Sequence, residues 1–156
     1  MIEVEIPGFA TLQFQHLVLD VNGTIAKDGQ LLEGVRDLLK QLRSSLDIHL
    51  ITADTNSTQD TVDKLLDLTA VRIPPQNQIK AKLDFIGRLG LSTVVAIGNG
   101  ANDADMLEHA ALGIAVIGPE GSAMKTMLKA DIAVTDIRAA LELLLYPKRI
   151  AATLRR

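Results

Sequence analysis

The 156-residue chain contains no cysteine and no tryptophan, and only 3% of its residues are aromatic. The absence of cysteine excludes disulfide bonds and thiolate metal sites. An excess of one charge is also missing, because 16 Lys and Arg residues against 19 Asp and Glu residues leave a net charge of -3. Such a balance provides no basic surface for nucleic acid or anionic lipid. We therefore expect neither nucleic acid nor a membrane as a partner.

Long hydrophobic runs are lacking as well. The longest ones, at 94–98 and 112–118, are interrupted or ended by glycine and are too short to span a bilayer. The N-terminus has no secretory pattern, which favours the cytoplasm. Hydrophobic residues nevertheless make up 47% of the chain, enough for one substantial core. We expect a cytoplasmic protein with a single domain over residues 1–156.

Apolar residues alternate with polar ones at both ends of a Pro7-Gly8 turn signal, which predicts an N-terminal β-hairpin. After it, short apolar runs alternate with segments of helical periodicity. The predicted strands are 16–20, 48–51, 71–73, 93–97, 113–117 and 132–134, and the predicted helices are 31–42, 58–68, 79–89, 104–110, 122–130 and 137–145. This order predicts a three-layer, Rossmann-like α/β fold with a parallel sheet and helices on both faces.

Polar residues follow three of the predicted strands directly. Asp20 ends the first, Thr52 follows the second, and the loop 98–103 follows the fourth. Open α/β sheets bind ligands at the carboxyl ends of their strands. These three segments are therefore expected to form one site.

The residue types in these segments suit phosphoryl chemistry. Asp20 in Asp20-Val-Asn-Gly-Thr is a possible nucleophile, which needs a cation to offset its repulsion from a phosphoryl group. In Gly98-Asn-Gly-Ala-Asn-Asp103, glycines allow close backbone approach while amide and acidic side chains can bind a metal ion. Each segment also has a purely structural interpretation, as a turn after a strand or, for Thr52 and Asp103, as a helix cap.

The segments resemble the motifs of the haloacid dehalogenase (HAD) superfamily. Asp20-Val-Asn-Gly-Thr resembles its first motif, Asp-x-Asp-Gly-Thr, and Ile51-Thr52-Ala-Asp54 fits its second. The loop 98–103 resembles Gly-Asp-Gly-x-Asn-Asp, found in P-type ATPases and phosphoserine-phosphatase-like enzymes. The matches run in the family's order from Asp20 to about Asp136, whereas the N-terminal hairpin lies outside them.

The resemblance implies a Mg²⁺-dependent phosphohydrolase that acts on a small phosphorylated metabolite. Asp20 would form an aspartyl-phosphate. The resemblance further implies that Mg²⁺ is held by Asp20, the Asn22 carbonyl, Asn99 and Asp103, and phosphate by Gly23, Thr52, Ala53, Lys82 and Asn102. The lysine assignment rests on Ile86 and Leu89, which follow Lys82 at the family's spacing; Lys80 is the alternative.

Neither usual position of a cap domain has room for one in this chain. Only one helical segment separates the first motif from the second, and only one more precedes Lys82. The resemblance therefore implies a cap-less HAD core whose site is open unless a neighbouring subunit covers it. Small cap-less relatives often do this as oligomers, so we expect a homo-oligomer, either a tetramer or a dimer.

Two positions depart from the family pattern. Asn22 replaces the aspartate that protonates the leaving group, and general acid-base help is worth ~10²- to 10⁴-fold in rate. Asn99 replaces an aspartate that binds Mg²⁺, so the site loses one negative charge and should bind Mg²⁺ more weakly. Slow turnover is expected. A catalytically weak phosphate-binding or regulatory module and a structural oligomerisation domain remain alternatives.

Several other residues are expected to have structural roles. The three histidines share no ligand spacing, and Glu120 and Asp136 are interpreted as helix-start signals. The basic tail 149–156 is expected to be a solvated terminus or a subunit contact. A fragment of a membrane P-type pump is disfavoured, because the Asp-Lys-Thr-Gly-Thr string of those pumps is absent.

Overall fold

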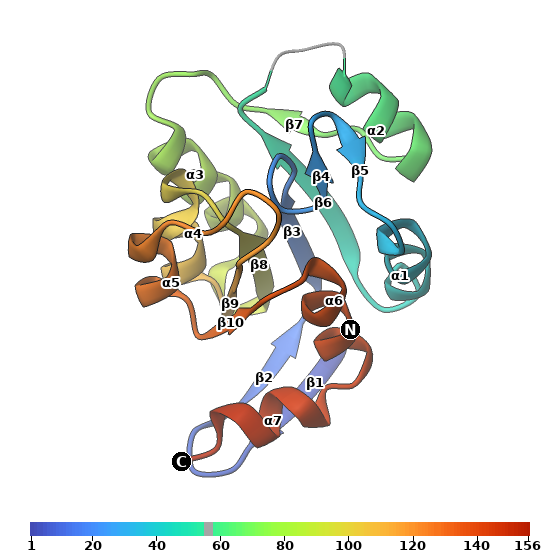
Figure 1. Cartoon of the computed structure of the whole chain (residues 1–156). Coiled ribbons are helices and arrows are strands. Elements are labelled where there is room, and N and C mark those ends of the chain that lie inside the picture. Colours follow the sequence, from blue (N-terminus) through green and yellow to red (C-terminus); the bar gives the residue numbers. More distant parts are fainter. Residues whose placement is uncertain (55–57) are drawn as a thin grey trace.

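A parallel β-sheet forms the centre of the computed structural model, which describes residues 1–54 and 58–156 (Figure 1). Its six strands lie in the order β10-β9-β8-β3-β6-β7. They are β3 (His16–Asp20), β6 (Asp47–Thr52), β7 (Val71–Arg72), β8 (Val94–Gly98), β9 (Leu112–Val116) and β10 (Ile132–Val134). Each neighbouring pair is parallel, which confirms the α/β prediction.

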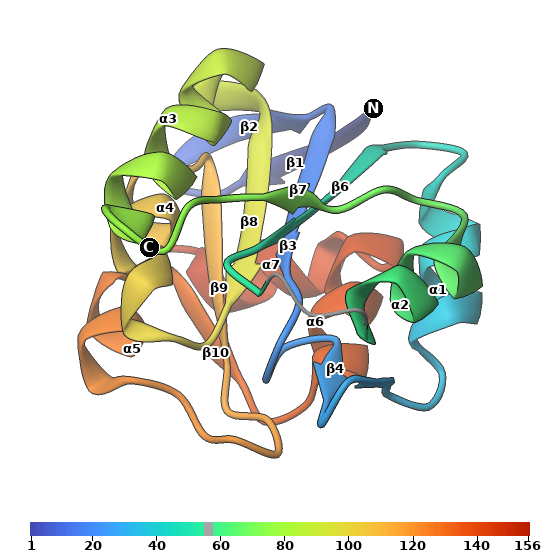
Figure 2. The same ribbon diagram turned by 90° about the horizontal axis from the view of Figure 1, so that it is seen from above.

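Helices cover both faces of this sheet, so its strands are apolar on both sides. In β3, Leu17 and Leu19 belong to one hydrophobic cluster and Val18 to the other, as expected for side chains that alternate along a strand. Figure 2 shows the two helical layers from above. One contains α1 (Val35–Leu42), α2 (Thr58–Leu66) and α6 (Ile137–Leu145), and the other contains α3 (Gln78–Leu89), α4 (Ala104–His109) and α5 (Met124–Lys129).

The strand order gives β3 a special position. The chain moves outward from β3 to β6 and β7, then returns to β8 on the other side of β3 and moves outward again to β9 and β10. This reversal explains why α1 and α2 cover one face and α3 to α5 the other. It also creates a topological switch point between β3 and β8, where open sheets bind their ligands.

The N-terminal hairpin is confirmed, with β1 (Ile2–Ile6) antiparallel to β2 (Ala10–Phe14) in a sheet of its own. The basic tail, expected to be a solvated terminus or a subunit contact, forms α7 (Lys148–Leu154) and is not simply solvated, because it packs on β1 with Ile150 fully buried. The backbone N–H of Arg156 donates to the carbonyl of Pro7 at 3.0 Å. Figure 1 shows this end of the molecule away from β7 and α2.

A small antiparallel hairpin occupies residues that the periodicity assigned partly to a helix. It consists of β4 (Ala26–Lys27) and β5 (Gln30–Leu31), so Leu31 lies in a strand and α1 starts only at Val35. The turn residues Asp28 and Gly29 have φ values of 51° and 75°, which suit a tight two-residue hairpin and not a helix.

Short 3₁₀ segments precede β8 and α4, namely η1 (Leu91–Thr93) and η2 (Ala101–Asp103). In the parts of the chain that the structure describes, no helix is both long and apolar enough to cross a membrane.

Candidate active site

The three predicted site segments meet at the carboxyl edge of the central strands. Asp20 is the last residue of β3 and is in register with Ile51 of β6, so Thr52 lies one residue beyond it. On the other side, Ile97 of β8 is in register with Leu19, which brings Gly98 next to Asp20. The sequence prediction that these strand ends converge is confirmed.

Lys82 of α3 lies at the centre of this edge and is fully buried. Its Nζ donates to Asp20 Oδ1 at 2.7 Å and to Asp103 Oδ1 at 2.5 Å. Lys80 is exposed and instead pairs with Asp84 one turn along the helix. Of the two lysines that the sequence offered, the structure brings Lys82 to the site.

Burial and charge act in opposite directions on this network. Burial, followed by the Asp103 carboxylate, raises the pKa of Asp20 from its ordinary 3.8 to about 7, although Lys82 and Thr24 lower it. Burial lowers the pKa of the Lys82 ammonium, but Asp20 and Asp103 together outweigh burial and raise that pKa. Lys82 is therefore a fixed positive charge, whereas Asp20 is an unusually basic carboxylate.

Asp103 holds the loop after β8 in shape. Its Oδ2 accepts hydrogen bonds from the backbone N–H groups of Asn99 at 3.0 Å and Gly100 at 2.9 Å. A Cβ at Gly98 would lie 2.5 Å from Asp103 Cγ, so glycine is required there. Both Asp103 oxygens thus have partners within the protein, and the side chain is fully buried.

Three oxygen atoms lie together at the site, namely Asp20 Oδ2, Thr24 Oγ1 and Asn99 Oδ1. Only the Thr24 hydroxyl carries a proton. Thr24 Oγ1 lies 3.1 Å from Asp20 Oδ2 and 3.1 Å from Asn99 Oδ1. Because a hydroxyl carries one proton, Thr24 can donate to only one of these acceptors at a time. A hard cation such as Mg²⁺ prefers oxygen ligands of this kind. The set formed by Asp20, Thr24 and Asn99 therefore fits a divalent cation.

Carboxylates alone would not complete such a cation site. Within residues 1–54 and 58–156, no group of three or more His, Cys, Asp or Glu side chains could hold a metal ion. A cation at Asp20 would rely on neutral oxygens as well, such as the Asn99 amide and backbone carbonyls. Thr24, which belongs to the first motif, was not among the predicted site residues; its place two residues after Asn22 was the available signal.

The other predicted residues flank this network. The exposed Asn22 donates from Nδ2 to Asp54 Oδ2 at 3.3 Å, and the N–H of Gly23 donates to the Ala26 carbonyl at 2.8 Å. Thr52 Oγ1 accepts from the N–H of Asp54 at 3.0 Å. Ala53 follows Thr52 and is half-buried.

The Asn102 side chain contacts the start of α3. Its Nδ2 donates to Gln78 Oε1 at 2.7 Å, which ties the loop after β8 to the start of α3. The predicted role of Asn102 in phosphate binding stays a prediction.

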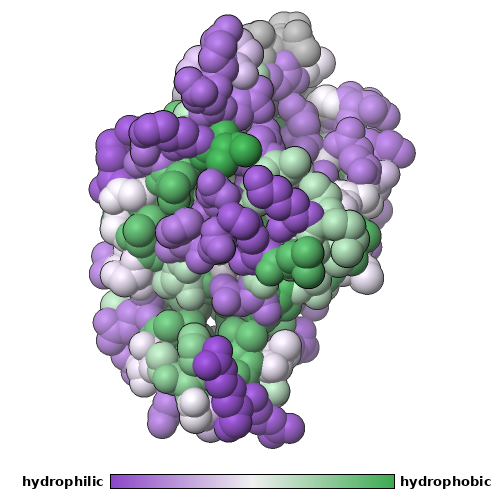
Figure 3. Space-filling model, turned by 90° about the vertical axis from the view of Figure 1, so that its left-hand side faces the viewer, coloured by the Kyte–Doolittle hydropathy of each residue, from purple (hydrophilic) through white to green (hydrophobic). Residues whose placement is uncertain are grey.

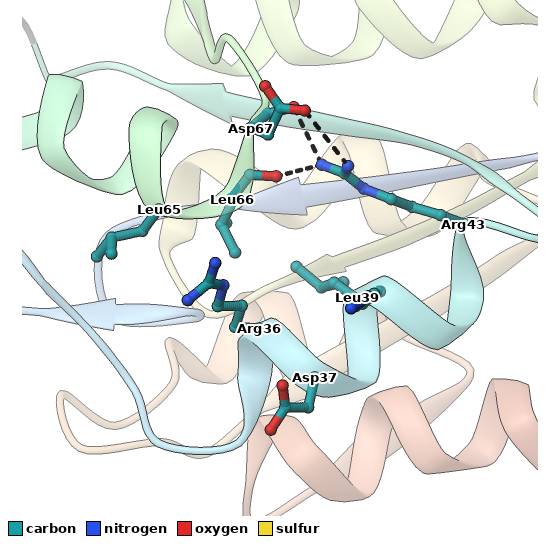
Figure 4. A pocket seen from close by; sticks show the side chains of 8 residues that line it. Arg36, Asp37, Leu39, Arg43, Leu65, Leu66 and Asp67 are labelled. Atoms are coloured by element: carbon teal, nitrogen blue, oxygen red, sulfur yellow. Dashed lines mark hydrogen bonds and ion pairs between the residues drawn. The ribbon is translucent and has the colours of Figure 1, made fainter.

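A separate hollow lies between α1 and the end of α2 (Figure 4). Its lining includes Arg36 and Arg43, but the Arg43 guanidinium already donates to the carbonyls of Leu66 and Asp67. The residues of the three strand-end segments do not line it. We assign it no part in the chemistry.

Comparison with known proteins agrees with the fold. The family of haloacid dehalogenase-like hydrolases matches residues 86–136, which include the loop after β8. The crystal structure of 3-deoxy-D-manno-octulosonate 8-phosphate phosphatase from Moraxella catarrhalis, in complex with a magnesium ion, a phosphate ion and KDO, has a TM-score of 0.65 at 24% identity and covers 91% of this chain and 94% of that one. A phospho-aspartyl intermediate analogue of phosphoserine phosphatase has a TM-score of 0.67 at 17% identity and covers 86% and 99%.

Two curated relatives match parts of the sequence. An uncharacterized protein of Methanocaldococcus jannaschii is 55% identical over 62 residues, which are 40% of this chain and 67% of that protein. The phospholipid-transporting ATPase NEO1 of Saccharomyces cerevisiae is 33% identical over 90 residues, which are 58% of this chain but only 8% of the pump. The chain is therefore similar to haloacid dehalogenase-like hydrolases over residues 86–136, and it shares its fold with these phosphatases.

Proposed function

We propose that the protein is a Mg²⁺-dependent phosphohydrolase that forms an aspartyl-phosphate at Asp20 and acts on a small phosphorylated metabolite. The observation that carries the proposal is the placement of Asp20, buried at the end of β3 with Lys82 on one oxygen and Thr24 on the other. The phosphatases with the same fold, one with magnesium and phosphate and one as a phospho-aspartyl analogue, support this interpretation.

In the first step a carboxylate oxygen of Asp20 attacks phosphorus. An O–P bond to Asp20 forms, the ester P–O bond breaks, and the alcohol leaves. Lys82 keeps the attacking carboxylate in place and offsets its charge. In the second step water attacks the same phosphorus, which releases phosphate and restores Asp20.

A divalent cation bound at Asp20, Asn99, Asp103 and the Asn22 carbonyl would offset the repulsion between the carboxylate and the phosphate. Asp103 keeps Asn99 and Lys82 in position through its two occupied oxygens. The proposed phosphate-binding residues stay as predicted, namely Gly23, Thr52, Ala53, Lys82 and Asn102. Gly23 and Asn102 would exchange their present hydrogen bonds for phosphate oxygens, whereas the Thr52 hydroxyl accepts in its present bond and still has a proton to donate.

Slow turnover is part of the proposal. The Asn22 amide cannot transfer a proton to the departing alkoxide, which therefore takes its proton from water. The missing general acid lowers the rate by ~10²- to 10⁴-fold for poor leaving groups. This feature also favours the second candidate function, a phosphate-binding or regulatory module with weak catalysis. A cytoplasmic, cap-less single domain that forms a dimer or tetramer remains our expectation.

Release of p-nitrophenol from its phosphate ester tests the proposal, because this leaving group needs no general acid. We expect Mg²⁺-dependent turnover that falls by at least ~10³-fold in Asp20→Asn. Asp105→Asn is the matched control, since it makes the same change at an exposed ion pair and should keep full activity. Equal turnover in Asp20→Asn and Asp105→Asn would refute the aspartyl-phosphate, whereas no turnover by the wild type would leave the binding module as the function.

A further inference from the structure

A turn at residues 118–123 is attached to the site by Asn99. The Asn99 side-chain Nδ2 donates to the Gly121 carbonyl at 3.1 Å. The Asn99 carbonyl accepts from the N–H of Ala123 at 2.8 Å and from Ser122 Oγ at 3.2 Å. These three bonds fix a segment that the sequence suggested only as a helix start and that ends directly before α5.

The bond to Gly121 requires an amide at position 99. Gly121 presents a carbonyl oxygen, which only accepts hydrogen bonds, so the atom of residue 99 that faces it has to be a donor. An aspartate would set a carboxylate oxygen against that carbonyl. The Asn99 side chain therefore has two roles: Oδ1 lies beside Thr24, and Nδ2 holds the Gly121 carbonyl. The second role gives a physical reason for asparagine at this position.

The same turn brings Glu120 onto the loop of the first motif. A Cβ at Gly23 would lie 2.4 Å from Glu120 Oε2 and 2.6 Å from Asn99 Nδ2, so both groups lie against one side of Gly23. Gly118 also approaches this loop, because a Cβ there would lie 3.1 Å from the Gly23 carbonyl. The Glu120 carboxylate is thus a neighbour of the Asn99 amide and is exposed to solvent.

The net charge of the site shows what the Glu120 carboxylate adds to it. In their ionised forms Asp20, Lys82 and Asp103 together carry one net negative charge. An aspartate at position 99 would supply a second one, and the charge count of the ligands sets how strongly an oxygen site holds a divalent cation. Asp54 is the other carboxylate near the first motif, but its Oδ2 is bound by Asn22, on the β6 side.

We propose that Glu120 supplies the negative charge that position 99 lacks, so that the site at Asp20 attracts a divalent cation although it has Asn99. The inference rests on the metal site of the proposed function. Glu120 acts through its charge beside Asn99 and Gly23, and Asn99 is the residue that positions it through the bond to Gly121.

Titration calorimetry with MgCl₂ alone tests this inference without any turnover. Glu120→Gln should weaken the Mg²⁺ affinity by about tenfold, because it removes a negative charge that lies beside the site and attracts the divalent cation. Glu5→Gln is the matched control: Glu5 is exposed on β1, in the hairpin at the opposite end of the molecule, and the same loss of charge there should leave the affinity unchanged. Thermal midpoints in EDTA should agree among the three proteins, because both glutamates are exposed.

Two results would overturn the inference, namely equal Mg²⁺ affinity in Glu120→Gln and the wild type, or no binding by the wild type at all. Failure of the proposed function gives a different pattern. A protein without phosphatase activity that still loses Mg²⁺ affinity in Glu120→Gln would keep the inference and refute the function. Phosphatase activity that depends on Asp20, with the same Mg²⁺ affinity in Glu120→Gln and the wild type, would support the function and refute the inference.

Discussion

Two lysines of this protein each bridge a pair of carboxylates, in very different surroundings. Lys82 contacts Asp20 and Asp103 at 2.7 and 2.5 Å, and all three side chains are at most 11% exposed. Lys129 of α5 contacts Asp105 and Glu108 at 2.9 and 2.6 Å, and these side chains are 29–45% exposed. Figure 3 looks onto the side where α4 and α5 lie and shows hydrophilic areas next to hydrophobic ones there.

Similar contacts therefore have different energetic meanings. At the surface, water and salt reduce an ion pair to a small contribution. In the interior, desolvation competes with the attraction, and an unpaired partner is left with an uncompensated charge. The pKa directions agree with this contrast, since burial raises the pKa of Asp20 while the hydrogen bond from Lys129 lowers that of Asp105. Ionisable groups that are buried despite the cost of desolvation are typical of functional sites.

The largest difference is expected on removal of the two lysines. Lys82→Met leaves Asp20 and Asp103 buried without a cation, and should lower the free energy of unfolding by roughly 3–5 kcal/mol. Lys129→Met should lower the free energy of unfolding far less, because water and salt screen its ion pairs. Urea denaturation at pH 7.5 in EDTA measures both. Similar losses of unfolding free energy in the two variants would show that charge does not hold Lys82, Asp20 and Asp103 together.

The two aspartates should respond to pH in opposite directions. The pKa of Asp20 is raised to about 7, so its ionisation costs stability as pH rises from 3.8 through about 7. Asp20→Asn should therefore stabilise the metal-free protein at pH 8, by about 1–3 kcal/mol, and bring little gain at pH 5. A gain of the same size at both pH values would contradict the raised pKa.

The pKa of Asp105 is lowered, first by the hydrogen bond from Lys129, so its contribution is present above 3.8 and is lost as pH falls below that value. Asp105→Asn should destabilise slightly at pH 8, by at most about 0.5 kcal/mol for so exposed a pair. Thermal melts of both variants at pH 5 and pH 8 make the comparison.

Salt should produce the smallest difference. A double-mutant cycle between Lys129 and Asp105 is expected to lose most of its coupling of a few tenths of a kcal/mol when NaCl rises from about 0.05 to about 0.5 M, because exposed charges are screened. The coupling between Lys82 and Asp20 should stay nearly constant, since little water or salt reaches either side chain. If both coupling energies depended equally on salt, solvent would have to reach the buried side chains of Lys82, Asp20 and Asp103.

The sequence predicted the sheet well because its signals are local. Alternating apolar runs predicted all six strands to within one or two residues, and glycines and amides predicted the loop after β8. It failed at β4–β5, where Asp28 and Gly29 form a tight turn beside residues with helical spacing, and at α7. That helix is short, and its stability comes from packing on β1, which no local pattern reports.

The sequence by itself determined the α/β fold, the HAD motifs and the strand ends at which Asp20, Thr52 and Gly98 lie, because strand periodicity and turn residues act over a few neighbours. Only the tertiary structure decided between Lys80 and Lys82, since residues two apart on a helix face different directions and burial selects one. It also decided that Asn99 ties down residues 118–123 and that Glu120 meets Gly23. These contacts join residues far apart in the chain, and folding alone brings them together.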